Sequence, residues 1–318
     1  MMKSEDKLQN GLVVALLALV CCFLWGSAFP CIKIGYAMLN IASEDTASQI
    51  LFAGARFTLA GILTIILGSA LSHQVLVPKK TSWGMVARLC LAQTVVQYLF
   101  FYIGVANTSG VKGSIIVSSN VFFAILGSCL IVHTEKLGKF KILGCILGFA
   151  GVVLINLNGS GLTGGMSFFG EGFILLSTLS YAASSIMIKM YGAKENPVTL
   201  SGWQFLMGGL IMAAIGAVMG GRLHGFTLGS TLLLLYMAMI SAVAYSIWGI
   251  LLKHNPVGRI SVFGFMNPVF GVTLSAILLR EQNQAFTMQG FLSLLLVCVG
   301  IYLVNKDFSA GSGKAAAR

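Results

Sequence analysis

The sequence is dominated by apolar segments that are each close to the length at which an α-helix crosses a bilayer, ~20 residues for ~30 Å of hydrocarbon. Ten such segments follow one another, at residues 12–36, 49–71, 84–106, 111–132, 141–158, 171–190, 199–220, 229–252, 258–280 and 288–304. Only 9% of the residues are charged, and no polar connection is long enough for a soluble domain. Because a backbone in lipid must satisfy its own hydrogen bonds, these segments predict an all-α integral membrane protein with ten transmembrane helices.

The basic residues predict how these helices are oriented. A net charge of +11 would indicate nucleic acid as the partner of a soluble protein, but in a membrane protein the placement of Lys and Arg matters more. With a cytoplasmic N-terminus most of the 20 Lys and Arg fall on the inner side, and the connections 37–48 and 157–170 carry none. We therefore expect a multi-pass protein of the cell (plasma) membrane with both termini cytoplasmic. The first segment also resembles a signal peptide, but it has a counterpart in the second half of the chain.

The two halves of the chain repeat each other in sequence order. Five stretches of the first half match five of the second at an offset of about 150 residues. The equivalent pairs are Trp25 and Tyr181, Arg56 and Gln204, Tyr98 and Tyr245, Phe101 and Trp248, Asn120 and Asn267, and Glu135 and Glu281. We interpret this as the duplication of a unit of five helices.

The duplication predicts both the organisation of the chain and a class of function. The first repeat covers 11–156, a glycine-rich linker 157–170, the second repeat 171–305 and a disordered tail 306–318. Because five is an odd number, the second copy enters the membrane from the opposite side, and a pseudo-two-fold axis in the membrane plane relates the copies. Such inverted repeats are typical of secondary transporters, in which the substrate binds near the midplane between the halves.

Two motifs make the chain similar to a known family. The stretch "WGSAFPCIK" in the first helix and the run "PVFGVTLSAILLRE" ending at Glu281 resemble the EamA-type members of the drug/metabolite transporter superfamily. The resemblance implies a basket-like bundle around a central cavity lined mainly by helices 1, 3, 4, 6, 8 and 9, and export of small metabolites, often amino acids. The family usually has a proline where the first copy has Phe122, and the second copy keeps it as Pro268. We therefore expect a kink in one half only.

Polar and aromatic side chains within the helices are the candidate substrate-binding residues. On helix 3, Gln93, Gln97 and Phe101 follow at intervals of four and are expected on one face. The other candidates lie at comparable depth: Trp25, Asn120, Tyr181, Tyr245, Trp248 and Asn267. Each has a plainer interpretation, since amides also join helices by hydrogen bonds and aromatic rings also pack in the core. Two prolines, Pro30 and Pro268, are candidates for a kink or gate because they disrupt helix hydrogen bonds.

The charged residues near the helix ends leave two interpretations open. Lys33, Arg56 and Lys112 are expected near the outer face, where they either extend to the surface or form a basic vestibule that attracts carboxylates. Glu135 and Glu281 are interpreted as solvated or capping charges. No acidic residue lies in the central part of a helix, which favours facilitated diffusion or exchange over proton coupling.

The sequence lacks the motifs that are typical of several other chemistries. The seven cysteines form no C-x-x-C pair, the four histidines form no H-E-x-x-H motif, and "GSGKA" near the C-terminus is not a P-loop. We expect no cofactor, no metal and no ATP, and a transporter for a small-molecule substrate instead of an enzyme. A multidrug or cation efflux carrier, a membrane enzyme and a lipid-handling protein remain as alternatives. The identity of the substrate and the oligomeric state stay open.

Overall fold

A computed structural model of the chain describes residues 8–133, 136–157, 166–192, 194–255, 260 and 262–312, and these contain helices and no strand. Nine helical segments of this described part are long and apolar enough to cross a membrane, and the shorter apolar segment Phe263–Leu278 supplies the tenth. The prediction of an all-α membrane protein with ten helices is confirmed. Glu135 and most of the predicted linker, 158–165, lie outside the described residues.

The helix bounds agree with the apolar segments to within a few residues. The first, second and fifth spans are the single helices α2 (Gly11–Met38), α3 (Thr46–Ser72) and α8 (Lys139–Asn156). The third span consists of η1 (Lys80–Ser82), α4 (Trp83–Leu89), η2 (Cys90–Val96) and α5 (Gln97–Ala106). The fourth consists of α6 (Gly110–Val117), α7 (Ser119–Leu126) and η3 (Gly127–Ile131). The last five are η5 (Phe168–Gly172) with α9 (Phe173–Tyr191), α10 (Pro197–Val218), α11 (Leu228–His254), η6 (Val262–Phe265) with α13 (Met266–Leu278), and α15 (Met288–Ser312), preceded by the short α14 (Gln282–Ala285). Within the predicted tail, residues 306–312 continue α15, and 313–318 lie outside the described part.

The helix starts follow from capping residues that the sequence supplies. Asn10 accepts the backbone N–H of Leu12 at the start of α2 (3.0 Å), and Asp45 accepts that of Ser48 in α3 (3.0 Å). Thr227 and Ser230 form a reciprocal capping box at the start of α11. These side chains satisfy the orphan N–H groups of the first turn, which is why each helix begins where it does.

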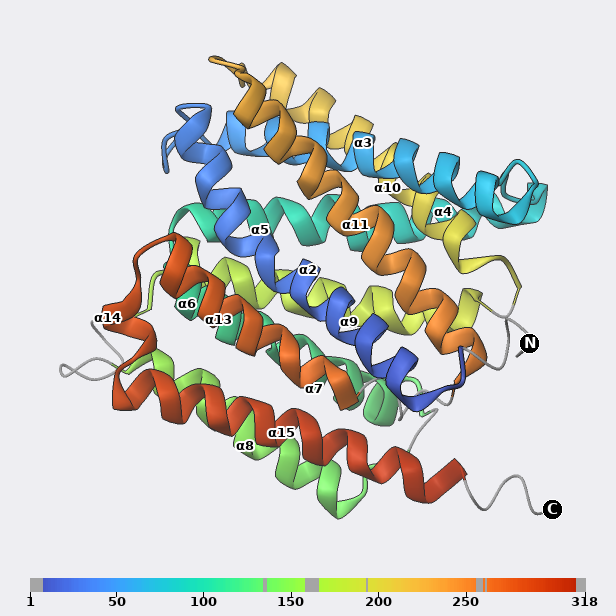
Figure 1. Cartoon of the computed structure of the whole chain (residues 1–318), viewed down its shortest axis with the longest axis vertical. Coiled ribbons are helices and arrows are strands. Elements are labelled where there is room, and N and C mark those ends of the chain that lie inside the picture. Colours follow the sequence, from blue (N-terminus) through green and yellow to red (C-terminus); the bar gives the residue numbers. More distant parts are fainter. Residues whose placement is uncertain are drawn as a thin grey trace.

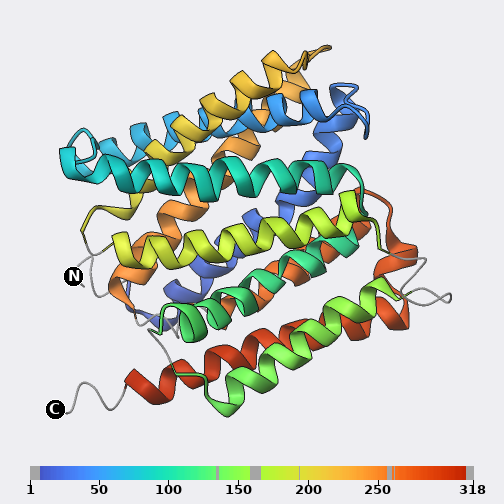
Figure 2. The ribbon, with the colours of Figure 1, turned by 180° about the vertical axis from the view of Figure 1, so that it is seen from behind.

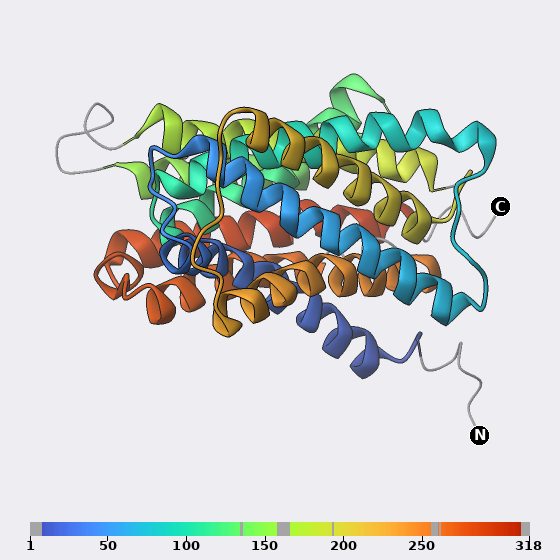
Figure 3. The same cartoon turned by 90° about the horizontal axis from the view of Figure 1, so that it is seen from above.

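The helices form two layers that are closed at both edges by a helix pair. Figure 1 shows α11, α2 and α13 in the front layer, and Figure 2 shows α5, α9, α6 and α7 on the other side. The view from above separates the same two layers (Figure 3). The pairs α3 with α10 and α8 with α15 pack closely at the two edges. In Figure 1, α2 begins and α15 ends at the same end of the bundle, as an even number of helices requires.

The packing follows the pseudo-two-fold relation that the repeat predicts. α2 packs on α11 and α13, and its equivalent α9 packs on α5 and α7, the equivalents of those two helices. Single hydrogen bonds repeat as well. Asn156 Nδ2 donates to the carbonyl of Val152 at 2.8 Å, and Asn305 Nδ2 donates to that of Ile301 at 2.8 Å. The two five-helix repeats thus enclose the space between the layers in equivalent ways.

The helix breaks differ from the prediction of one kink. The ninth helix is divided into η6 and α13, and Pro268 lies in the first turn of α13, where its missing N–H is not needed. The fourth helix is also interrupted, between α6 and α7, although Phe122 replaces the proline. There Ser118 Oγ donates to the carbonyl of Ser114 (3.1 Å), a back-bond that bends helices. The break therefore occurs in both halves, although only one of them has the proline.

Candidate functional site

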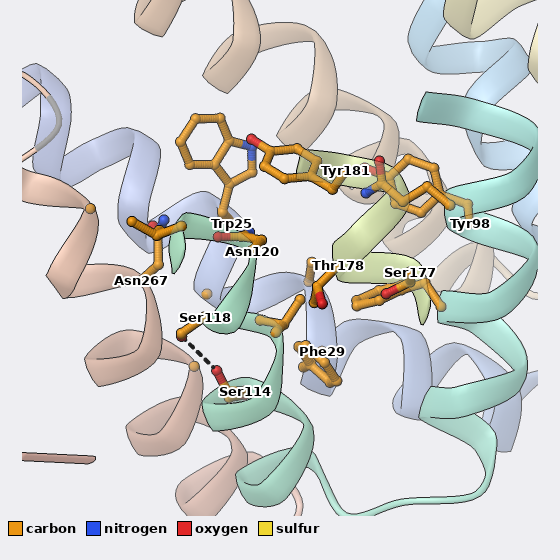
Figure 4. A pocket seen from close by; sticks show the side chains of 18 of the residues that line it. Trp25, Phe29, Tyr98, Ser114, Ser118, Asn120, Ser177, Thr178, Tyr181 and Asn267 are labelled. Atoms are coloured by element: carbon orange, nitrogen blue, oxygen red, sulfur yellow. Dashed lines mark hydrogen bonds between the residues drawn. The ribbon is translucent and has the colours of Figure 1, made fainter. Parts of the chain in front are cut away.

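A cavity of about 130 Å³ lies between the two layers of the bundle. Its walls come from α2, α3, α5, α6, α7, α9, α11 and α13, with single contributions from η6 and α15. Figure 4 shows side chains from both repeats around it, among them Trp25, Tyr98, Asn120, Tyr181 and Asn267. This volume is below the ~300–1,000 Å³ typical of drug-sized sites, so the cavity in this state suits a small molecule.

Seven of the nine predicted substrate-binding residues line this cavity. They are Trp25, Gln97, Phe101, Asn120, Tyr181, Tyr245 and Asn267. The lining includes three pairs of repeat-equivalent positions, namely Trp25 with Tyr181, Tyr98 with Tyr245, and Asn120 with Asn267. Tyr98 was not among the candidates, although its equivalence to Tyr245 is a signal that could have found it. The two repeats therefore contribute matching side chains to one cavity.

Gln93 does not line the cavity, although it was expected on the same face as Gln97. Its Oε1 accepts a hydrogen bond from Nε2 of Gln204 at 2.8 Å, and Oε1 of Gln204 accepts one from the hydroxyl of Thr94 at 2.6 Å. The reason is the π-helical segment η2, whose i→i+5 turns change the rotation of side chains along the third helix. Gln93 thus joins the third helix to α10 by a hydrogen bond, which is the alternative to substrate binding that was given for these amides.

Trp248 also lies outside the lining and packs behind it. Its ring meets that of Trp25 edge to face at a centroid distance of 5.1 Å, and Trp25 meets Tyr245 in the same way at 5.5 Å. Edge-to-face pairs of this kind hold aromatic rings in defined orientations. Trp248 therefore positions the ring of Trp25, which itself faces the cavity.

The two prolines are not part of the cavity wall. Pro30 is buried within α2, which continues through it from Gly11 to Met38, and Pro268 is buried in the first turn of α13 next to the lining residue Asn267. Both can affect the shape of helices that carry lining residues. Their role as a gate stays a prediction.

Three polar atoms at the cavity are buried without a hydrogen-bond partner. They are Nε1 of Trp25, Oε1 of Gln97 and Oδ1 of Asn267. An unpartnered polar group in a low-dielectric interior is costly, and native structures contain few of them. These atoms comprise one donor and two acceptors, which is a set that the polar groups of a bound molecule can satisfy.

Arg56 is a cavity residue that the sequence prediction placed elsewhere. It was expected near the outer face, but it is 2% exposed and lines the cavity from the middle of α3. The signal was present, because an ionisable residue inside a transmembrane helix is expected to face the bundle interior or a cavity. Ser241 and Thr178, also in the wall, had no signal of their own among the many small polar residues of the chain.

A second, open hollow lies at the end of the bundle where α6 begins, and it contains both Lys33 and Lys112. Lys112 Nζ lies 3.8 Å from a carboxylate oxygen of Glu171. Glu281 accepts the backbone N–H groups of Gly110 (3.0 Å) and Val111 (2.8 Å) at the start of α6. Glu281 is therefore a helix cap, which is one of the two roles predicted for it, the other being a solvated charge. The carboxylates of Glu171 and Glu281 offset the basic charge of this hollow, which we call the vestibule.

The described residues hold no group of three or more His, Cys, Asp or Glu that could bind a metal ion. Six of the seven cysteines are buried, and the seventh, Cys298, is partly exposed. The cavity wall offers hydrogen-bonding and aromatic groups together with one guanidinium.

Known proteins of similar sequence include some that are named as transporters or efflux pumps. The chain is 28% identical to an uncharacterized transporter of Synechocystis sp. over 96% of this chain and 93% of the relative. It is 25% identical to the "Probable amino-acid metabolite efflux pump" of Escherichia coli over 90% of this chain and 93% of that protein. The fold also matches a crystal structure with a TM-score of 0.64 at 14% identity, covering 90% of this chain and 95% of the other.

The sequences of a transporter family match both halves of the chain separately. The EamA-like transporter family aligns with residues 12–157 and again with residues 168–306. The two matches together span nearly the whole chain, and each contains one set of five helices. The chain belongs to the EamA-like transporter family.

Proposed function

We propose that the protein is a secondary transporter that moves a small metabolite, such as an amino acid, across the cell membrane by alternating access. It is a membrane transporter by family, and its relatives are named as transporters and efflux pumps. The proposal adds the substrate class, an exporting or facilitating direction and the mechanism. In it the N- and C-termini are cytoplasmic, and the vestibule with Lys33 and Lys112 faces outward.

The observation that carries the proposal is the central cavity with its matched lining from both repeats. A site formed at the interface of two inverted repeats can be opened to either side by movement of one repeat against the other. The equivalent residues Trp25 and Tyr181, and Asn120 and Asn267, would then meet the substrate from opposite halves in both states.

The test is counterflow in proteoliposomes. Purified protein is reconstituted with an unlabelled metabolite inside, and uptake of the labelled metabolite is measured across a panel of amino acids, nucleobases and small organic cations. We expect stimulated uptake for at least one amino acid and none in protein-free liposomes. Uptake that continues linearly without saturation would indicate a channel, and the absence of exchange for every compound would contradict the proposal.

One observation favours a second candidate, an efflux carrier for organic cations. The rings of Trp25 and Tyr245 line the cavity, with Trp248 packed behind Trp25, and the faces of such rings attract cations. The same counterflow panel separates the candidates, because a cation carrier exchanges quaternary ammonium compounds and ignores amino acids.

A further inference from the structure

We propose that Arg56 binds a carboxylate of the transported molecule, so that the central cavity selects small anionic or zwitterionic metabolites over cations. The inference rests on the proposed transport function and specifies its substrate class. It starts from Arg56, the one charged side chain among the described residues that line the cavity.

Arg56 is held firmly at the cavity wall by neutral partners. Its Nε donates to the carbonyl of Met237 at 3.0 Å, one Nη donates to the hydroxyl of Tyr102 at 2.9 Å and the other to that of Ser241 at 3.4 Å. The guanidinium carbon lies 5.0 Å from the ring centroid of Phe57. The side chain is 2% exposed, so these contacts fix its direction without neutralising its charge.

Among the described residues that line the cavity, no acidic side chain balances this charge. Arg56 is the only charged residue among those that line the cavity, and the one salt bridge within the described part of the chain joins Lys112 to Glu171 in the vestibule. An isolated charge in a low-dielectric interior is costly, and arginine stays charged at physiological pH. An anion that enters the cavity would remove much of that cost, whereas a cation would increase it.

The guanidinium also keeps donors available. It has five N–H groups, and the three hydrogen bonds above occupy three of them. Two N–H donors on a planar group suit the two oxygens of a carboxylate. A lysine would provide the charge without this planar arrangement.

The charge of Arg56 has no counterpart at the equivalent position of the second repeat. The position equivalent to Arg56 is Gln204, whose amide is bonded to Gln93 and Thr94 and does not line the cavity. Elsewhere the cavity offers unpartnered acceptors, Oε1 of Gln97 and Oδ1 of Asn267. A molecule with a carboxylate at one end and a hydrogen-bond donor at the other complements both, which is the pattern of a zwitterion.

The test compares matched ligands that differ in the carboxylate. Thermal unfolding of the purified full chain in detergent is measured with increasing leucine, leucinamide and 4-methylvalerate, and with the phenylalanine counterparts of these compounds. For at least one series we expect the carboxylates to stabilise the wild type, with apparent affinity about tenfold or more above that of the amide, as for other charge-assisted pairs. Arg56→Gln should abolish this preference, and Arg56→Lys should retain part of it.

Arg88→Gln is the matched control, because Arg88 is exposed on α4 and lies outside the cavity lining. It should keep the wild-type preference. Since Arg56→Gln leaves acceptors without their donor, the preference is also measured in Arg56→Lys, which keeps a charged donor at the site. A purely structural role would lower the melting temperature of the variants but leave the ratio between carboxylate and amide unchanged.

Two results would overturn the inference: a wild type that carboxylates stabilise no better than amides, or an Arg56→Gln variant that keeps the preference. Counterflow with the same compounds tests the proposed transport separately. Carboxylates that bind through Arg56 but are not exchanged would refute transport and support the site. Amides exchanged as well as carboxylates would support transport and refute the role of Arg56.

Discussion

Asn120 and Asn267 show how single residues connect the repeat to the site. Each lies one residue after the start of a helix, α7 or α13, directly beyond the break in its span. Both line the cavity, and Oδ1 of Asn267 has no partner. Amides from equivalent positions of two inverted repeats that meet in one cavity are placed as a substrate site at the repeat interface would require. We therefore favour the interpretation that they bind the polar end of the substrate.

Asn120→Ala and Asn267→Ala should each lower kcat/KM for transport by roughly tenfold or more, mainly through a raised apparent KM, because a buried hydrogen bond to the substrate is lost. The melting temperatures should change little, since interhelical hydrogen bonds in membranes average only ~0.6 kcal/mol. Counterflow kinetics and thermal unfolding measure the two effects. Asn156→Ala is the control, as Asn156 lies outside the cavity and should leave transport unchanged. Normal transport by both cavity variants would show that the pair is structural.

At the scale of elements, the bundle is held together where glycines let helices approach closely. Along the α3–α10 pair, a side chain at Gly209 would meet the backbone of Phe57 and Thr58, and one at Gly54 would meet the backbone of Ala213. Van der Waals contact between close backbones stabilises helix pairs in lipid, where the hydrophobic effect contributes little. The edges of the two layers depend on such contacts.

Gly209→Ala should destabilise the protein, because the new methyl group must push two helix backbones apart, and overpacking typically costs roughly 1–3 kcal/mol. Gly249→Ala in α11 is the matched control, since its Cβ would meet nothing within 4 Å. The higher helix propensity of alanine should make this control neutral or slightly stabilising. Thermal unfolding in detergent checks both. Equal melting temperatures for the two variants would contradict the importance of the α3–α10 contact.

At the scale of the whole molecule, the inverted repeat predicts two access states with exchanged gates. Asn107 and His254 mark equivalent places at opposite ends of the bundle, and each side chain bonds the carbonyl four residues earlier, at 2.9 Å in both cases. A movement that closes one end should open the other.

A membrane-impermeant thiol reagent should label Asn107→Cys from outside intact cells and His254→Cys only in inside-out vesicles, if both termini are cytoplasmic. The native cysteines are mostly buried, which keeps the background low. Substrate should change the two labelling rates in opposite directions, because it shifts one equilibrium between two states. Rates that never respond in a protein that transports would indicate a channel, and labelling of His254→Cys from outside would reverse the orientation.

The sequence by itself determined the helices, because the length and apolar character of each segment leave no other backbone structure in lipid. It also determined the pairing of the two halves, since equivalent residues such as Asn120 and Asn267 retain a common register. Seven predicted residues line the cavity, and the matched pairs Trp25 with Tyr181 and Asn120 with Asn267 are among them. Their role in binding stays a prediction.

Only the tertiary structure decided which polar residues face the cavity and which join helices. The four-residue spacing of Gln93 and Gln97 could not reveal the π-helical segment that turns Gln93 toward Gln204. The break at Ser118 lies where the sequence has no proline, beside the hydrogen bond from Ser118 to Ser114. Arg56 is directed inward by partners on two other helices, at Tyr102 and Met237, far away in the sequence. Contacts between helices set these directions, and spacing along one helix does not encode them.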